Sequence, residues 1–188
     1  MSEPRLLPAI IASLAIFCLC IGIGALAVWQ DPALGERVLG VLNEELFADI
    51  LDDSPALISL KLFLNNLGAC IILFLGGASA GLLTVVILAA NGVVIGVVTE
   101  LVRQEQGLLY VAAALAPHGI FEIPAFITAS ALGLMLGQAL LLELQGGGNA
   151  AGSAGEFGSA FVRVVVPLLA IAAVVEAFIT PAIIPLVA

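Results

Sequence analysis

One short segment of a long apolar stretch carries two ionisable side chains. Between Pro117 and Pro124 lie the only histidine of the chain, His118, and a carboxylate four positions later, Glu122. Residues four apart share one face of a helix, so this imidazole and this carboxylate could exchange a proton. Because ionisable groups are costly at membrane depth, the pair is a candidate functional site. It predicts a proton or cation relay or a substrate site. The alternative is a purely structural link between helices.

Further polar side chains interrupt the apolar runs near their middles. Glu176 lies in the last run, with Thr180 as its local polar partner one turn later, and asparagines lie in the second and third runs. If the runs fold into a bundle of helices, these groups can meet away from lipid. We therefore expect one intramembrane polar cluster, either binding or structural, formed by Asn65, Asn66, Asn91, His118, Glu122 and Glu176.

Other candidate chemistries have weaker support in the sequence. Glu100 and Arg103 stand at the end of an apolar run, where we expect an interfacial ion pair. No ligand spacing predicts a metal site, and no motif predicts a cofactor. Ser79 lies in a Gly-x-Ser-x-Gly string, and a dyad of Ser79 with His118 would make an intramembrane hydrolase. The strand–turn–helix context of that string is not predicted here, so a small-residue turn is favoured.

Composition defines the class of protein. Of the 188 residues, 62% are hydrophobic and 10% charged, and the mean hydropathy is +1.25. Soluble domains are about half apolar and a quarter charged, so this composition predicts an integral membrane protein. Only five residues are Lys or Arg, and the formal net charge is −9. A nucleic-acid-binding surface is therefore excluded, because it needs a basic patch.

The apolar runs predict an all-α, polytopic membrane helix bundle in a single membrane domain. A spanning helix needs about 20 apolar residues. Five segments meet this requirement, and we expect transmembrane helices over residues 6–29, 57–76, 80–101, 118–142 and 164–188. Residues 32–55 alternate apolar and acidic side chains at helical spacing. They predict an amphipathic acidic helix that lies on the membrane surface or on the other helices.

Two stretches are expected to depart from regular helix. Residue 116 precedes Pro117, which disfavours helical angles there. We expect a half-helix over 108–116, broken or re-entrant, and a kink at Pro124. Residues 145–159 are rich in Gly, Ala and Ser and predict a flexible loop. Glycines four apart, as in the pairs Gly77/Gly81, Gly92/Gly96 and Gly133/Gly137, predict close helix packing within one chain or between copies.

Several stretches together resemble a known family. The string from Pro117 to Ala125, Pro-His-Gly-Ile-Phe-Glu-Ile-Pro-Ala, is similar to the signature of the stage II sporulation protein M family. Three others follow that family in the same order, namely Phe63–Asn66, Asn91 and Gly92 with Gly96, and Glu176–Pro181. The resemblance covers about residues 57–188. It points to Asn65, Asn91, His118, Glu122 and Glu176 as the residues that carry the family pattern.

The resemblance implies a multi-pass integral membrane protein. In spore-forming bacteria the named member is the membrane component of a group with two peptidoglycan-degrading partners, while similar proteins in other bacteria and in archaea have no assigned role. We therefore expect a non-enzymatic scaffold or assembly component of the cell membrane. Its expected partners are the lipid bilayer, a second copy, with a dimer favoured, and envelope-remodelling proteins. The alternative is a transporter or channel for a proton, cation or small substrate, and the intramembrane hydrolase is a remote third.

Overall fold

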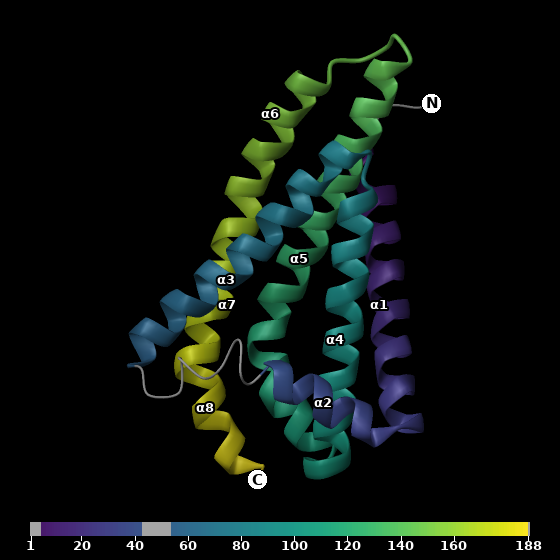
Figure 1. Cartoon of the computed structure of the whole chain (residues 1–188). Helices are drawn as coiled ribbons and strands as arrows, with labels where there is room; N and C mark the ends of the chain where they lie inside the picture. The colour runs from purple at the N-terminus through teal and green to yellow at the C-terminus, as the bar shows by residue number, and fades with distance from the viewer. Residues whose placement is uncertain (1–4, 43–53, 188) are drawn as a thin grey trace.

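The structure is all-helical over the residues that it describes. This computed structural model describes residues 5–42 and 54–187, and its regular elements there are helices (Figure 1). Five helical segments are long and apolar enough to cross a membrane, namely Leu6–Gln30, Pro55–Ser79, Leu82–Gln106, Leu108–Leu144 and Ala150–Leu186. The prediction of an all-α bundle with five spans is confirmed.

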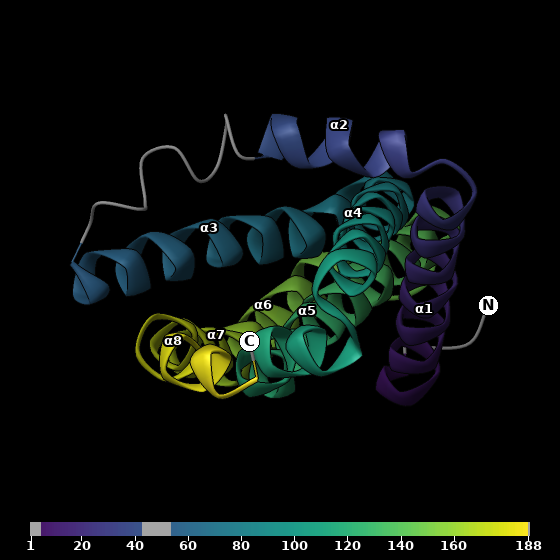
Figure 2. The same cartoon turned by 90° about the horizontal axis from the view of Figure 1, so that it is seen from below.

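The long helix α5 (Leu108–Leu144) stands at the centre of the bundle. It packs against α1 (Leu6–Gln30), α3 (Pro55–Leu75), α4 (Leu82–Gln106) and α7 (Val166–Val174). Seen from below, α1 lies on one side of α5, and α3 and α7 lie on the other (Figure 2). The core is formed where these helices meet, by side chains such as Phe17, Leu73, Leu88, Phe126 and Leu169.

The helix α2 (Pro32–Leu42) lies along one side of the bundle near the lower ends of α1 and α4, and it contacts both helices (Figures 1 and 2). It is the first part of the segment 32–55 that was expected to be amphipathic. Residues 43–53, which carry most of the acidic side chains of that expectation, lie outside the described residues.

The turn between α3 and α4 follows the small-residue string. A short 3-10 segment, η2 (Gly76–Ser79), leads into Ala80 and Gly81, whose φ angles are 57° and 86°. These left-handed angles carry little strain at glycine. The Ser79 hydroxyl donates to the carbonyl of Gly76 and accepts the backbone N–H of Leu83, so it caps the start of α4.

The expected break at residues 116–117 is absent, because α5 runs as one helix from Leu108 to Leu144 through both Pro117 and Pro124. The local preference of a residue before proline is overridden by packing, since α5 contacts α1, α3, α4, α6 (Ala150–Ala160), α7 and α8 (Thr180–Ile183). The half-helix over 108–116 is thus the first part of a 37-residue helix. At 1.5 Å per residue that helix is about 55 Å long, so it extends beyond a ~30 Å hydrocarbon core.

The expected loop at 145–159 is also shorter than predicted. Residues 145–149 form the turn, and α6 (Ala150–Ala160) follows at once. The Asn149 side chain accepts the backbone N–H of Gly152, and the Glu143 carboxylate accepts that of Ala150. These two bonds satisfy N–H groups at the start of α6, which offsets its poor helix-forming composition.

The last membrane segment contains two wide turns, each just before a proline. The π-helical segments η3 (Phe161–Val165) and η4 (Val175–Ile179) precede Pro167 and Pro181, and the helix continues through α7, α8 (Thr180–Ile183) and the 3-10 turn η5 (Ile184–Leu186). Proline has no backbone N–H to give to the preceding turn. The π-turns take up the changed register, and such turns are frequent at functional sites. Glu176 lies in η4.

Glycines mediate the close contacts between helices inside this chain. A Cβ added to Gly96 of α4 would overlap the carbonyl oxygen of Ile21 in α1, and one added to Gly133 of α5 would overlap the carbonyl oxygen of Leu73 in α3. Backbones can approach this closely only where side chains are missing. The glycine pairs therefore serve packing within one chain.

Candidate functional site

A short contact between His118 and Glu176 joins α5 to the last membrane segment. Nδ1 of His118 lies 2.5 Å from Oε2 of Glu176, across two elements that are 58 positions apart in the chain. Both atoms are buried, and the contact is an ion pair when the imidazole is protonated. The π-turn η4 presents Glu176 to α5 at this position.

Glu122 extends this contact along α5. Its Oε2 lies 3.9 Å from Nε2 of His118, one helical turn before it. The imidazole therefore stands between two carboxylates. The side chain of His118 is 15% exposed, whereas those of Glu122 and Glu176 are 31% and 35% exposed.

Glu122 also lines a small cavity that is bounded by α1, α3, α4 and α5. The cavity has a volume of about 90 Å³, and its polar lining consists of Asn65, Asn66, Asn91 and Glu122. Phe17, Ala69, Ile95, Ile123 and Phe126 form its apolar walls. The arrangement thus brings the six residues of the expected cluster into two adjoining groups, the cavity and the His118–Glu176 contact, which share Glu122.

The remaining candidate residues lie in local interactions. Arg103 holds the carboxylate of Glu100 through two bonds of 2.7 Å, and Gln104 adds a third of 2.9 Å. This network lies in the last turns of α4, and none of its residues lines the cavity. The Thr180 hydroxyl donates to the carbonyl of Val175 at 3.5 Å, across the π-turn that carries Glu176.

The geometry contradicts the Ser79–His118 hydrolase. The turn that contains Ser79 packs on α5, because a Cβ at Gly77 would overlap the carbonyl oxygen of Gly133 and one at Gly137 would overlap the backbone nitrogen of Gly81. Gly133 is 15 positions after His118 on the same helix, which is about 22 Å along its axis. Nucleophile and base must lie within hydrogen-bond reach, and the Ser79 hydroxyl is already bonded within its own turn.

Over residues 5–42 and 54–187, no group of three His, Cys, Asp or Glu side chains is placed to hold a metal ion. Cys20 and Cys70 are buried as thiols, and Cys18 is exposed.

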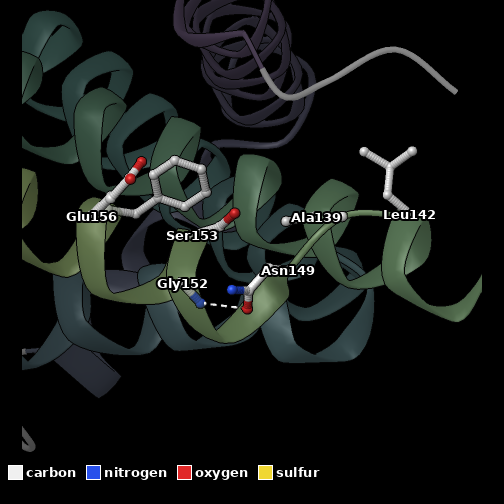
Figure 3. A pocket seen from close by; sticks show the side chains of 8 residues that line it. Ala139, Leu142, Asn149, Gly152, Ser153 and Glu156 are labelled. Carbon is white, nitrogen blue, oxygen red and sulfur yellow. Dashed lines mark hydrogen bonds between the residues drawn. The ribbon is translucent and has the colours of Figure 1, made fainter. Parts of the chain in front are cut away.

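A second cavity, which the sequence did not indicate, lies where α5 meets α6 (Figure 3). It has a volume of about 330 Å³, and Asn149, Ser153 and Glu156 provide polar groups on its α6 side. The Asn149 oxygen is already occupied by the N–H of Gly152. A helix-capping Asn followed by alanines was the available signal for α6, and the high glycine content of the stretch obscured it.

Five helices that are long and apolar enough to cross a membrane define a polytopic integral membrane protein. A comparison with family models gives a match to stage II sporulation protein M over residues 13–181. The chain therefore belongs to the stage II sporulation protein M family. The match includes most of the first span and the acidic segment, which showed no recognisable signature by themselves. Comparisons with curated proteins and with solved structures found no match.

Proposed function

We propose that this protein is a non-enzymatic scaffold of the cell membrane, an assembly component that acts as a homo-oligomer. The observation that carries the proposal is the contact between His118 and Glu176. It joins α5 to the last membrane segment. Among the described residues, neither of the two buried atoms has a hydrogen bond to another group. A group paired in this way fixes the position of a helix, which is the property that a scaffold needs. The resemblance to the stage II sporulation protein M family implies envelope-remodelling proteins as partners, and we include them in the proposal.

The partial exposure of two carboxylates supports assembly with a second copy. Glu122 and Glu176 are each about one third exposed on the isolated chain. Carboxylates at membrane depth normally face protein or water. α5, which carries Glu122, also has a groove of about 420 Å³ that is lined by Val111, Ala112, Leu115, Ala116, Gly119, Ile120, Ile123 and Pro124. Its small residues allow close approach of another helix, and we assign that place to α5 of a second copy.

Filling this groove should separate the copies. We expect Ala116→Trp to lower the dimer fraction by about tenfold or more, because the indole occupies the space that the second helix needs. Molar mass measured by light scattering in detergent or by mass photometry in nanodiscs tests this. Leu82→Trp, at an exposed site on α4, is the matched control and should keep the wild-type mass. A monomeric wild type at all concentrations, or a dimeric Ala116→Trp variant, would contradict the proposed assembly.

The polar cavity favours a second candidate function, transport of a proton or cation. Transport sites near the middle of a bilayer use polar groups and interrupted helices of this kind. The scaffold proposal predicts that wild-type protein in vesicles moves protons, Na⁺ and K⁺ no faster than empty vesicles do. Fluorescent-dye flux assays on wild type, Glu122→Gln and Glu176→Gln decide between the two functions. Wild-type flux that both substitutions abolish would establish transport and remove the scaffold proposal.

A further inference from the structure

The polar cavity has the composition of a cation site. It combines one carboxylate, from Glu122 on α5, with the carboxamides of Asn65 and Asn66 on α3 and of Asn91 on α4. Carboxylate and amide oxygens are the ligands of hard cations. A volume of about 90 Å³ can hold a small ion together with a few water molecules. No Lys, Arg or His is among the described residues that line the cavity.

The hydrogen bonding of Asn91 orients one of these oxygens. Its Nδ2 donates to the backbone carbonyl of Ile87 at 2.9 Å. A carbonyl can only accept, so the nitrogen of the amide must be the atom that faces Ile87. The Oδ1 of Asn91 is therefore left as an acceptor on a side chain that lines the cavity.

An ionised Glu122 would need an added positive charge beside the cavity. Among the described residues, the charged side chains in contact at this wall are Glu122 with His118, and His118 with Glu176. Even a fully protonated imidazole supplies one positive charge against two carboxylates. Because Glu176 has the shorter contact with His118, the uncompensated charge falls on Glu122, at the cavity wall. A charge left unpaired at membrane depth would be strongly unfavourable.

We propose that this cavity binds one monovalent cation, of the size of Na⁺, with the Glu122 carboxylate and the Oδ1 atom of Asn91 as ligands and the carboxamides of Asn65 and Asn66 completing the shell. The cation balances the single remaining negative charge and joins α3, α4 and α5. The site does not depend on the scaffold function, because a bound ion can stabilise the bundle with or without transport. Lys61, one turn before Asn65 on α3, is not among the residues that line the cavity.

Thermal unfolding of the full chain in detergent tests the site, with Na⁺ as the probe and choline replacing it at constant ionic strength. We expect the midpoint of wild type to rise with NaCl and to saturate, by about 5 °C or more at a hundredfold excess over the dissociation constant. Glu122→Gln should lose the response. Asn91→Ala keeps the carboxylate and should need about tenfold more Na⁺. Glu100→Gln, which alters a carboxylate outside the cavity, is the control and should respond as wild type does.

Three results would overturn the proposal. The first is a wild-type midpoint that is the same in Na⁺ and in choline. The second is an Na⁺ response that survives both Glu122→Gln and Asn91→Ala. The third is a midpoint that rises on acidification and ignores Na⁺, which would make a proton the occupant. If Glu122→Gln does not fold, the test uses Asn91→Ala alone. The measured quantity is then the increase in the Na⁺ concentration that this variant needs for the same rise in its unfolding midpoint. This unfolding experiment does not measure transport or oligomeric state. A negative result would therefore reject the cation site without rejecting the scaffold proposal.

Discussion

Replacing His118 by alanine should destabilise the protein by about 2 kcal/mol and lower its unfolding midpoint by about 5 °C. The substitution leaves Glu176 without its partner at membrane depth, where Nδ1 of His118 lies 2.5 Å from its Oε2. Breaking a fully buried pair costs about 3–5 kcal/mol, and an exposed pair at most about 1 kcal/mol. Glu176 is 35% exposed, so we expect an intermediate value. Thermal or denaturant unfolding in detergent, followed by circular dichroism, measures the change.

Ile120→Ala is the control for this substitution. Ile120 lies two positions away on the same helix and is 67% exposed, so its truncation should change the midpoint little. His118→Gln retains an N–H donor and should recover part of the lost stability. If His118→Ala were as stable as Ile120→Ala, the contact would have no structural role.

Replacing Gly96 by valine should have a still larger effect, with a loss of about 3 kcal/mol or more and little monodisperse protein. A Cβ at Gly96 overlaps the carbonyl oxygen of Ile21 and lies 3.0 Å from the backbone nitrogen of Ala25. These are backbone atoms of α1 and cannot rotate away, so α1 must separate from α4. Size-exclusion chromatography in detergent, together with unfolding, measures the result.

Gly22→Val is the matched control, because Gly22 lies on α1, in the same helix pair, and has nothing within 4 Å of an added Cβ. The same side chain placed there should leave the elution profile unchanged. Equal stability of the two valine variants would mean that α1 and α4 do not pack as described.

The spans were predictable because they depend on composition and length alone. The hairpin at Gly76–Gly81 was predictable for the same reason, since the apolar stretch around it is too long for one span and its middle consists of small residues. The expected helix break at Ala116 and Pro117 was wrong, because it used only the backbone preference of a residue before proline and not the packing around it. In the structure α5 packs against the helices that surround it, and it continues through both prolines.

The candidate site was predictable only in part. The sequence gives the depth of Asn65, Asn91 and Glu122 along their helices, but their direction depends on how each helix is rotated in the bundle. That rotation is set by contacts such as Gly96 on Ile21, which join segments far apart in the chain. The π-turn that carries Glu176 could not be predicted either, because its register depends on packing around Pro181.

The most direct test of the structural link is a double-mutant cycle on the two residues that form it. Unfolding free energies are needed for wild type, His118→Ala, Glu176→Ala and the double variant. We expect a favourable coupling energy of about 1–2 kcal/mol, so that the double variant is less destabilised than the sum of the two single variants. A coupling energy of zero would contradict a link between α5 and the last membrane segment through these side chains.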